Sequence, residues 1–315
     1  MLSEDKSTTG RSVVGAENKR RRAAGGSMAR RILRVGTRAL GAVSDEAAAR
    51  AAVRIWFSPP RRAISAEERR VLARAQPLPV EVEGRRVAAW SFGRGEPVFL
   101  VHGRGGRAAQ LLEWVEPIVA AGSRAILFDA LGHGDSAASP LGAGMSSFVE
   151  AAKSMIAVAD VVGRPKHVVA HSGGAVATFI AMQRGLVPKR LVLVAPFARP
   201  LLYAGPFEDW LGLSSAARAR FRTIAAARAG FDWEEVDLTS GGAKVDLPPT
   251  LVVHDAGDKE VPVVEGKAVA AAWPRSTLVL TQRLGHQRIL RDPDVIARAA
   301  SFLRADQGLN ETVSV

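Results

Sequence analysis

Cysteine is absent from the 315-residue chain. There is therefore no disulfide framework, no thiolate metal site and no cysteine nucleophile. Long apolar runs are also absent: the longest fall short of the ~18 to 20 residues that span a bilayer, and the N-terminus lacks the apolar core of a secretory signal. With 47% hydrophobic and 23% charged residues, the composition is that of an ordinary globular protein. We expect a soluble cytoplasmic protein.

Acidic residues are scarce only in the first quarter of the chain. Residues 1–75 hold 17 Lys and Arg against 7 Asp and Glu, whereas residues 76–315 hold 26 against 24. The net charge of +12 is therefore a property of the N-terminal part. Because the remainder is nearly neutral, we predict no nucleic-acid partner.

The first 27 residues differ in composition from the rest. They are polar and small around the basic run 19–22, which is typical of a disordered tail. Met28 opens a sequence that is itself suited to begin a protein. We expect that Met28 is the true start and that residues 1–27 come from an overlong gene prediction.

Residues 28–75 are predicted to form a helical extension. Its first part, 28–57, has a helical pattern that ends before the Pro59-Pro60 pair, since proline cannot continue a helix. Three arginines share one face of it: Arg30, Arg34 and Arg38. Two interpretations stay open. The helix packs on the main domain with its arginines in solvent, or residues 28–57 make a weak contact with an anionic membrane surface.

From residue 78 onward, short β-branched runs alternate with longer Ala-rich stretches. The predicted strands are 80–82, 87–92, 98–101, 125–128, 168–170, 191–194, 251–253 and 278–280. The predicted helices are 107–121, 146–163, 174–185, 262–273 and 293–304. From the third strand onward the runs are continuously apolar, as expected of strands buried on both faces. This pattern predicts an α/β fold with a mostly parallel, doubly wound sheet covered by helices on both faces.

One interval breaks this alternation. Residues 197–248 separate two strands by about twice the usual length and are rich in Arg, Ala, Phe and Trp. We therefore predict a core over 76–196 and 249–308, with 197–248 inserted late in the sheet as a small helical cap.

A serine stands at the apex of a predicted strand–turn–helix in residues 167–177, HVVAHSGGAVA. A nucleophile at such a turn is held in a strained backbone with its hydroxyl lifted clear of the sheet. Small neighbours are needed because strand and helix pass close together. Ser172 is the candidate nucleophile, with Ala170 where the G-x-S-x-G pattern has glycine.

Three further segments agree with this pattern in their order and position along the chain: VFLVHGRGG (98–106), ILFDALGHGDS (126–136) and LVVHDAGDKEVP (251–262). Gly285-His286 then follows the last predicted strand. Together these segments resemble the α/β-hydrolase family over residues 78–305. The family's order of nucleophile, acid and histidine is reproduced by Ser172, Asp258 and His286.

The resemblance implies an acyl-enzyme mechanism. His286 acts as the base for Ser172, and Asp258 orients the imidazole and stabilises its charged form. The backbone amides of Arg104 and Gly173 form the oxyanion hole. Epoxide- and halide-displacing relatives carry aspartate at the position of Ser172. A serine at this turn implies transfer of an acyl group to water. No cofactor and no metal are expected.

Several neighbours of these residues have competing interpretations. Asp255 competes with Asp258 as the acid, and the D-x-x-V-P spacing favours Asp258. His102 and His133 are expected to brace loops, and His171 to pack beneath the nucleophile. An acidic substrate group could bind Arg288 and Arg291, although solvated or paired arginines are commoner.

The expected substrate is a small-molecule carboxylic ester or thioester with an apolar acyl group. Its predicted contacts are the cap residues Phe207, Trp210 and Trp233. Two alternatives stay open: a non-catalytic ligand-binding protein on the same scaffold, and a membrane-surface lipid hydrolase docked by the basic N-terminal helix. The oligomeric state stays open.

Overall fold

The computed structural model describes residues 31–61, 63–240 and 245–305. The predicted tail 1–27 and Arg30 lie outside these residues. The chain divides into two compact units: Met1–Val53 with Ala204–Ile224, and Arg54–Tyr203 with Ala225–Val315. The second unit contains the whole sheet.

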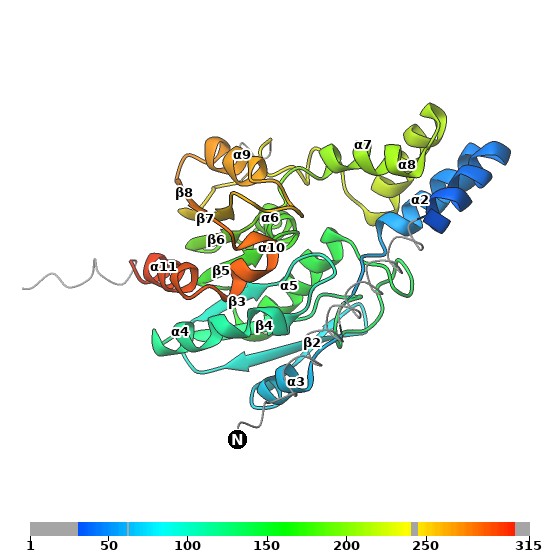
Figure 1. The fold of residues 1–315 in the computed structure, drawn as a ribbon. Coiled ribbons are helices and arrows are strands. Elements are labelled where there is room, and N and C mark those ends of the chain that lie inside the picture. The colour runs from blue at the N-terminus through cyan, green and yellow to red at the C-terminus, as the bar shows by residue number, and fades with distance from the viewer. Residues whose placement is uncertain (1–30, 62, 241–244, 306–315) are drawn as a thin grey trace, which may run out of the picture. The chain divides into compact units, whose positions relative to one another are not determined.

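The described strands form one eight-stranded sheet in the order β1-β2-β4-β3-β5-β6-β7-β8 (Figure 1). They are β1 (Gln76–Val82), β2 (Arg85–Phe92), β3 (Pro97–Val101), β4 (Arg124–Phe128), β5 (His167–His171), β6 (Arg190–Val194), β7 (Thr250–Asp255) and β8 (Ser276–Thr281). β2 runs antiparallel to β1 and β4, and the pairs from β4 through β8 are parallel. All eight predicted strands are therefore confirmed, and so is the mostly parallel sheet.

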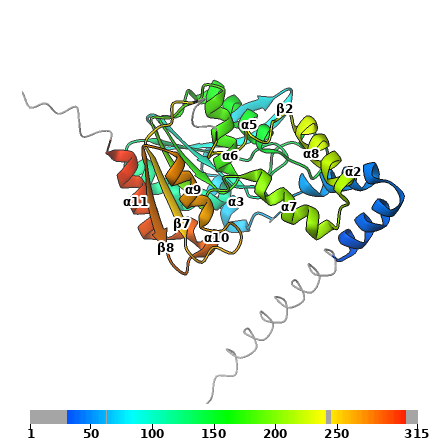
Figure 2. The same cartoon turned by 90° about the horizontal axis from the view of Figure 1, so that it is seen from above.

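Helices cover both faces of this sheet. They include α3 (Ala66–Leu72), the 3₁₀ helix η1 (Ala108–Trp114), α4 (Val115–Ala120), α5 (Phe148–Val162), α6 (Gly174–Gln183), α9 (Val264–Ala272), α10 (Gly285–Arg288), η3 (Ile289–Arg291) and α11 (Pro293–Arg304). α5 and α6 lie side by side (Figure 2). One core joins the sheet to α5, α6 and α9. The other joins it to η1, α4, η3 and α11.

Successive residues of the central strands alternate between these two cores. In β3, Phe99 and Val101 pack into the first core, whereas Val98 and Leu100 pack into the second. Because side chains of a strand point alternately to the two faces, both faces must be apolar, which explains the continuous apolar runs. β8 differs from this expectation: it is the last strand of the sheet, and its Leu280 is exposed.

The insertion between β6 and β7 contains two helices, α7 (Pro200–Leu211) and α8 (Ser215–Ala229). This confirms the predicted helical insertion late in the sheet. The division of the chain at residues 75, 197 and 248 remains a prediction.

The N-terminal helical stretch is interrupted. Residues 31–43 are helical, Ser44 is not, and α2 begins at Asp45 and ends at Trp56. The Ser44 hydroxyl accepts a hydrogen bond from the Ala47 amide at 3.3 Å, and Asp45 and Glu46 occupy the first turn of α2. A serine cap with acidic residues after it starts a new helix, so the described part of the predicted helical stretch 28–57 contains two helices. Among the described residues, no helix is long and apolar enough to cross a membrane.

Candidate active site

Ser172 lies in the turn between β5 and α6 with a backbone φ of +52°. This left-handed conformation is strained for a residue with a side chain. The surrounding backbone holds it there: the Ser172 amide donates to the Val194 carbonyl at 3.0 Å, and the Ser172 carbonyl accepts from the Phe197 amide at 3.2 Å. The predicted strand–turn–helix is thus present, with Ser172 at its apex.

Two glycines allow the backbone to approach this turn. A Cβ added at Gly103 would lie 2.8 Å from Ser172 Cβ. A Cβ added at Gly174 would lie 2.7 Å from the His102 carbonyl oxygen and 2.8 Å from the Val101 carbonyl oxygen. Since such contacts are too short for real Cβ atoms, the end of β3 and the start of α6 can pack this closely only with glycine at both positions.

Three side chains from separate segments of the chain meet at this point. His286, on α10, has its Nε2 2.9 Å from Ser172 Oγ and its Nδ1 2.7 Å from Asp258 Oδ2. All three side chains are buried. Because a carboxylate only accepts, Nδ1–H donates to Asp258, which leaves the lone pair of Nε2 facing the serine hydroxyl. The structure therefore brings together the three residues that the motif order selected.

Asp258 is held as a carboxylate. Its Oδ1 accepts the amides of Glu260 at 2.8 Å and Val261 at 2.9 Å. Burial on its own raises the pKa of Asp258, but hydrogen bonds from His254, His286 and the Val261 amide outweigh burial and hold this pKa well below its ordinary value. Asp258 is therefore ionised and oriented at neutral pH.

Asp255, the rival candidate, has a different set of partners. Its carboxylate is fully buried and accepts from the Gly257 amide at Oδ1 and from Thr281 Oγ1 and the Leu284 amide at Oδ2, each at 2.9 Å. These contacts tie the end of β7 to β8 and to the residue that precedes Gly285-His286. Sequence spacing did not reveal this role, because the partners lie 26 and 29 residues further along the chain.

His171 contacts the other side of the His286 loop. Its Nε2–H donates to the His286 carbonyl oxygen at 3.0 Å, and the two imidazole rings lie 4.7 Å apart between centroids. Burial, together with a smaller effect of the nearby His286, lowers the pKa of His171 to about 3. A neutral His171 can therefore support the His286 backbone without opposing a positive charge on the His286 ring.

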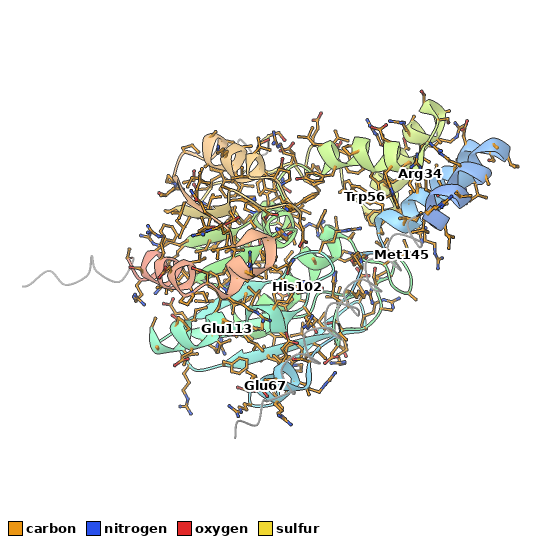
Figure 3. All side chains as sticks on the ribbon, viewed as in Figure 1. Arg34, Trp56, Glu67, His102, Glu113 and Met145 are labelled. Atoms are coloured by element: carbon orange, nitrogen blue, oxygen red, sulfur yellow. The ribbon has the colours of Figure 1, made fainter. Side chains whose placement is uncertain are left out.

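His102, labelled in Figure 3, and His133 both bond to loop backbone near the end of β3. His102 Nε2 accepts the Ala130 amide at 3.0 Å, so its Nδ1–H donates to the Gly103 carbonyl at 2.8 Å. His133 Nε2 accepts the Gly105 amide at 3.1 Å. These contacts hold the loop after β3 and match the bracing expected of both histidines.

The two predicted oxyanion donors are neighbours. A Cβ added at Gly173 would lie 3.2 Å from Arg104 N, so the two backbones run close together beside Ser172. Within residues 31–61, 63–240 and 245–305, neither the Arg104 nor the Gly173 amide donates to a protein acceptor. Both N–H groups are thus available to an oxygen atom placed next to Ser172. The Arg104 guanidinium instead donates to the Trp56 carbonyl.

A sequence model described as the alpha/beta hydrolase family matches residues 98–299, which include all three of these side chains. The chain belongs to the alpha/beta hydrolase family. No curated protein matches the chain.

Solved structures of this fold include similar proteins of several activities. A thermophilic esterase from Thermogutta terrifontis has a TM-score of 0.55 at 21% identity, covering 73% of this chain and 98% of that chain. A meta-cleavage product hydrolase from Pseudomonas fluorescens has a TM-score of 0.54 at 18% identity, covering 74% and 98%. A bromoperoxidase from Bacillus anthracis has a TM-score of 0.54 at 16% identity, covering 74% and 100%. At these identities the likeness shows the fold alone.

In this alpha/beta hydrolase chain, an aromatic cluster borders the nucleophile turn. A Cβ added at Gly173 would lie 2.8 Å from the Phe148 ring. The Phe148 and Phe197 centroids lie 5.8 Å apart, and those of Phe197 and Tyr203 lie 4.4 Å apart. Phe148 and Phe197 were not among the predicted site residues. The only signal was local, since Phe148 begins α5 and Phe197 follows β6 at the same edge of the sheet.

The aromatic residues predicted to bind substrate lie in different units. Trp233 belongs to the second unit, where its ring packs edge-on against Trp56 at 6.0 Å and Phe231 at 5.0 Å. Phe207 and Trp210 belong to the first unit, with their rings 6.0 Å apart. Their contact with substrate remains a prediction.

The two arginines near His286 have protein partners. Arg288 Nε donates to the Leu284 carbonyl at 3.0 Å, and Arg291 lies 3.8 Å from Glu68. Both contacts agree with the commoner interpretation, that of paired surface arginines. Among the described residues, no cluster of three or more His, Asp or Glu side chains is arranged to hold a metal ion.

Proposed function

We propose that the protein is a serine hydrolase that cleaves a carboxylic ester or thioester through an acyl-enzyme. The observation that supports it is the pair of contacts at His286: 2.9 Å from Nε2 to Ser172 Oγ and 2.7 Å from Nδ1 to Asp258 Oδ2. A serine hydroxyl is a weak nucleophile at neutral pH, and a base at this distance, oriented by a third group, is what activates it.

In the acylation step, Ser172 Oγ attacks the substrate carbonyl carbon as His286 Nε2 takes the hydroxyl proton. The carbonyl oxygen becomes an oxyanion that accepts from the amides of Arg104 and Gly173. Asp258 stabilises the imidazolium without itself taking the proton. His286 then returns the proton to the leaving oxygen or sulfur, the bond from this atom to carbon breaks, and the acyl group stays on Ser172.

Deacylation repeats these steps with water. His286 takes a proton from water as the water oxygen attacks the acyl carbon, and the same two amides hold the second oxyanion. The Ser172 Oγ–carbon bond then breaks, and the proton on His286 returns to Ser172. The products are the free acid and the regenerated enzyme.

An apolar acyl group is the substrate feature that the surroundings of Ser172 favour. Phe148 lies against Gly173, and Phe197 and Tyr203 extend the aromatic cluster from it. Aromatic side chains line ligand sites because they bury apolar area with few rotatable bonds. We therefore expect activity to rise with acyl length from acetate before it falls for chains too long for the site.

The test is hydrolysis of a p-nitrophenyl ester series, acetate through decanoate, by the wild type and by Ser172→Ala. We expect the variant to lose activity by a factor on the order of 10⁴ or more. Ser240→Ala is the matched control, since Ser240 is exposed and bonds only to carbonyls of its own loop. A fluorophosphonate probe should label the wild type and Ser240→Ala, and spare Ser172→Ala. A wild type that neither turns over any ester nor takes the label would contradict the proposal.

A further inference from the structure

The helix over residues 31–43 exposes its large apolar side chains. Val43 is 88% exposed, Ile32 64% and Val35 60%, and Leu33 and Leu40 are each above 40%. These five make up half of the large apolar side chains exposed in the described part of the chain. Ile32, Val35, Ala39 and Val43 follow the i, i+3, i+7, i+11 spacing that places them in one stripe of a helix. We call these four residues the outer apolar stripe.

The packed side of the same helix carries small residues instead. Thr37 is buried, with its hydroxyl bonded to the Leu33 carbonyl at 2.8 Å. A Cβ added at Gly41 would lie 3.7 Å from Ala48 Cβ on α2, in the same unit. The bulky apolar residues thus point away from the side by which the helix is held.

Positive charge flanks the outer apolar stripe. Arg31, Arg34 and Arg38 are exposed at i, i+3 and i+7, and no acidic residue occurs between 31 and 43 (Figure 3, with Arg34 labelled). Among the described residues, none of these three forms an ion pair, whereas Arg50 and Arg220 both pair with Glu46. The helix therefore exposes large apolar side chains beside arginines that form no ion pair within the described residues.

We propose that helix 31–43 docks the protein on an anionic lipid bilayer, with its axis in the membrane plane. The outer apolar stripe enters the boundary between headgroups and acyl chains, and the three arginines bind lipid phosphates. At about 1.5 Å per residue the described residues 31–43 cover ~20 Å, less than the ~30 Å hydrocarbon core, and we place them on the bilayer and not across it.

The chemistry of the helix favours a bilayer over other partners. Nucleic acid would engage the arginines but would leave the outer apolar stripe in water. A second copy on the same face would have to bury about 800 Å² per partner, more than one short helix offers, and would bring two sets of arginines together. An anionic bilayer satisfies both the apolar and the charged groups.

The experiment is sedimentation of the full chain with vesicles of phosphatidylcholine alone or mixed with phosphatidylglycerol, at low and high salt. We expect binding to the mixed vesicles that weakens with salt. Ile32→Gln with Val35→Gln should weaken it about tenfold per side chain, since burying such a residue contributes about 1.5 kcal/mol or more. Arg31→Gln with Arg34→Gln should weaken it about fivefold per charge, from ~1 kcal/mol each.

Two control variants separate this helix from other sources of binding. Val161→Gln removes an exposed apolar side chain from α5 and should bind like the wild type. Replacing the basic run Lys19–Arg22 by glutamine tests the N-terminal tail and should leave the effect of Ile32→Gln with Val35→Gln intact.

Four results would overturn the proposal. The wild type could fail to sediment with mixed vesicles. Binding could survive Ile32→Gln with Val35→Gln, or depend on residues 19–22 alone. Light scattering could instead show a dimer that this double variant dissociates, which would assign the outer apolar stripe to a second copy.

Discussion

The candidate active site at the end of the sheet and helix 31–43 differ in how their polar and apolar groups are matched. At the sheet, the buried Asp255, Asp258 and His171 each have hydrogen-bond partners at 3.0 Å or less. On helix 31–43, large apolar side chains are exposed and arginines lack an ion-pair partner within the described residues. Leaving a buried polar group unmatched costs ~1 to 3 kcal/mol, so partners of this kind fix the position of a side chain.

The difference indicates where each kind of function lies. A buried cluster whose polar groups all have hydrogen-bond partners keeps its side chains in fixed positions, which is what a chemical step requires. The outer apolar stripe lies in water in the described part of the chain, beside arginines that form no ion pair there. Only a partner that removes the stripe from water would lower its free energy. Substitutions at the two regions should therefore affect different measurements.

The largest effect is expected at Asp258. Asp258→Asn keeps the size of the side chain but replaces the acceptor that orients His286 Nδ1–H, and the favoured tautomer of His286 then presents N–H to Ser172. We expect kcat for ester hydrolysis to fall by ~10⁴. Steady-state kinetics on the best p-nitrophenyl ester measure it. Asp246→Asn is the matched control, because Asp246 is exposed and pairs only at the surface with Arg275. Similar losses in both variants would contradict the assigned role.

A smaller effect is expected at Asp255. Asp255→Ala removes the acceptor for Thr281 Oγ1 and for the Leu284 amide, two residues before His286. A displacement of the base by about 1 Å costs up to ~10² in rate, so kcat should fall between ten- and a hundredfold with KM little changed. Fluorophosphonate labelling should slow in proportion, without loss of the final labelled fraction. If instead only the melting temperature fell, Asp255 would serve stability alone.

Most of the fold could be predicted from local sequence. Apolar runs such as 98–101 and 168–170 have a strand's length and sit between helical stretches, and burial on both faces leaves them no polar position. The grouping of Ser172, Asp258 and His286 could be predicted because motif order reflects topology: β5, β7 and β8 run parallel in one sheet, so the loops that follow them lie at the same end of it. Ser172, Asp258 and His286 each follow one of these strands.

The remainder depends on partners distant in sequence. Asp255 ends β7 and Asp258 follows three residues later, and only the positions of Thr281, Leu284 and His286 decide which carboxylate meets which group. In helix 31–43 the periodicity predicted an amphipathic helix. It did not show that Thr37 and Gly41 form the packed side, because close packing through small residues leaves no hydrophobic signal.

A pH effect on stability is expected from His171. The pKa of His171 is about 3 in the folded protein and 6.5 for an unperturbed histidine, the value expected in the unfolded chain. Between these two pH values the unfolded chain therefore binds one proton more than the folded protein. The free energy of unfolding should therefore fall as pH falls, by ~1.4 kcal/mol per pH unit. His133, whose burial lowers its pKa to about 3, adds a similar slope. Asp258 contributes only further down, because its lowered pKa gives stability that is lost as pH falls below about 3.8.

Urea unfolding across this range separates the histidines. His171→Gln keeps an N–H donor for the His286 carbonyl and removes one titrating group, so about half of the slope from the two histidines should disappear between roughly pH 6.5 and pH 4.5. His133→Gln should remove a similar part. A slope in His171→Gln equal to that of the wild type would show that His171 is protonated in the folded protein or exposed to solvent.

The smallest effect is expected at the outer apolar stripe. Val35→Gln changes an exposed side chain and should alter the free energy of unfolding by no more than about 0.5 kcal/mol. Hydrolysis of a soluble p-nitrophenyl ester should stay at the wild-type rate. Val158→Gln makes the same substitution in a helix position that is fully buried, and should cost several kcal/mol, because an amide enters the core without a partner. Equal destabilisation by the two variants would mean that Val35 is packed in solution. The outer apolar stripe would then not be exposed, and this part of the contrast between the two regions would be contradicted.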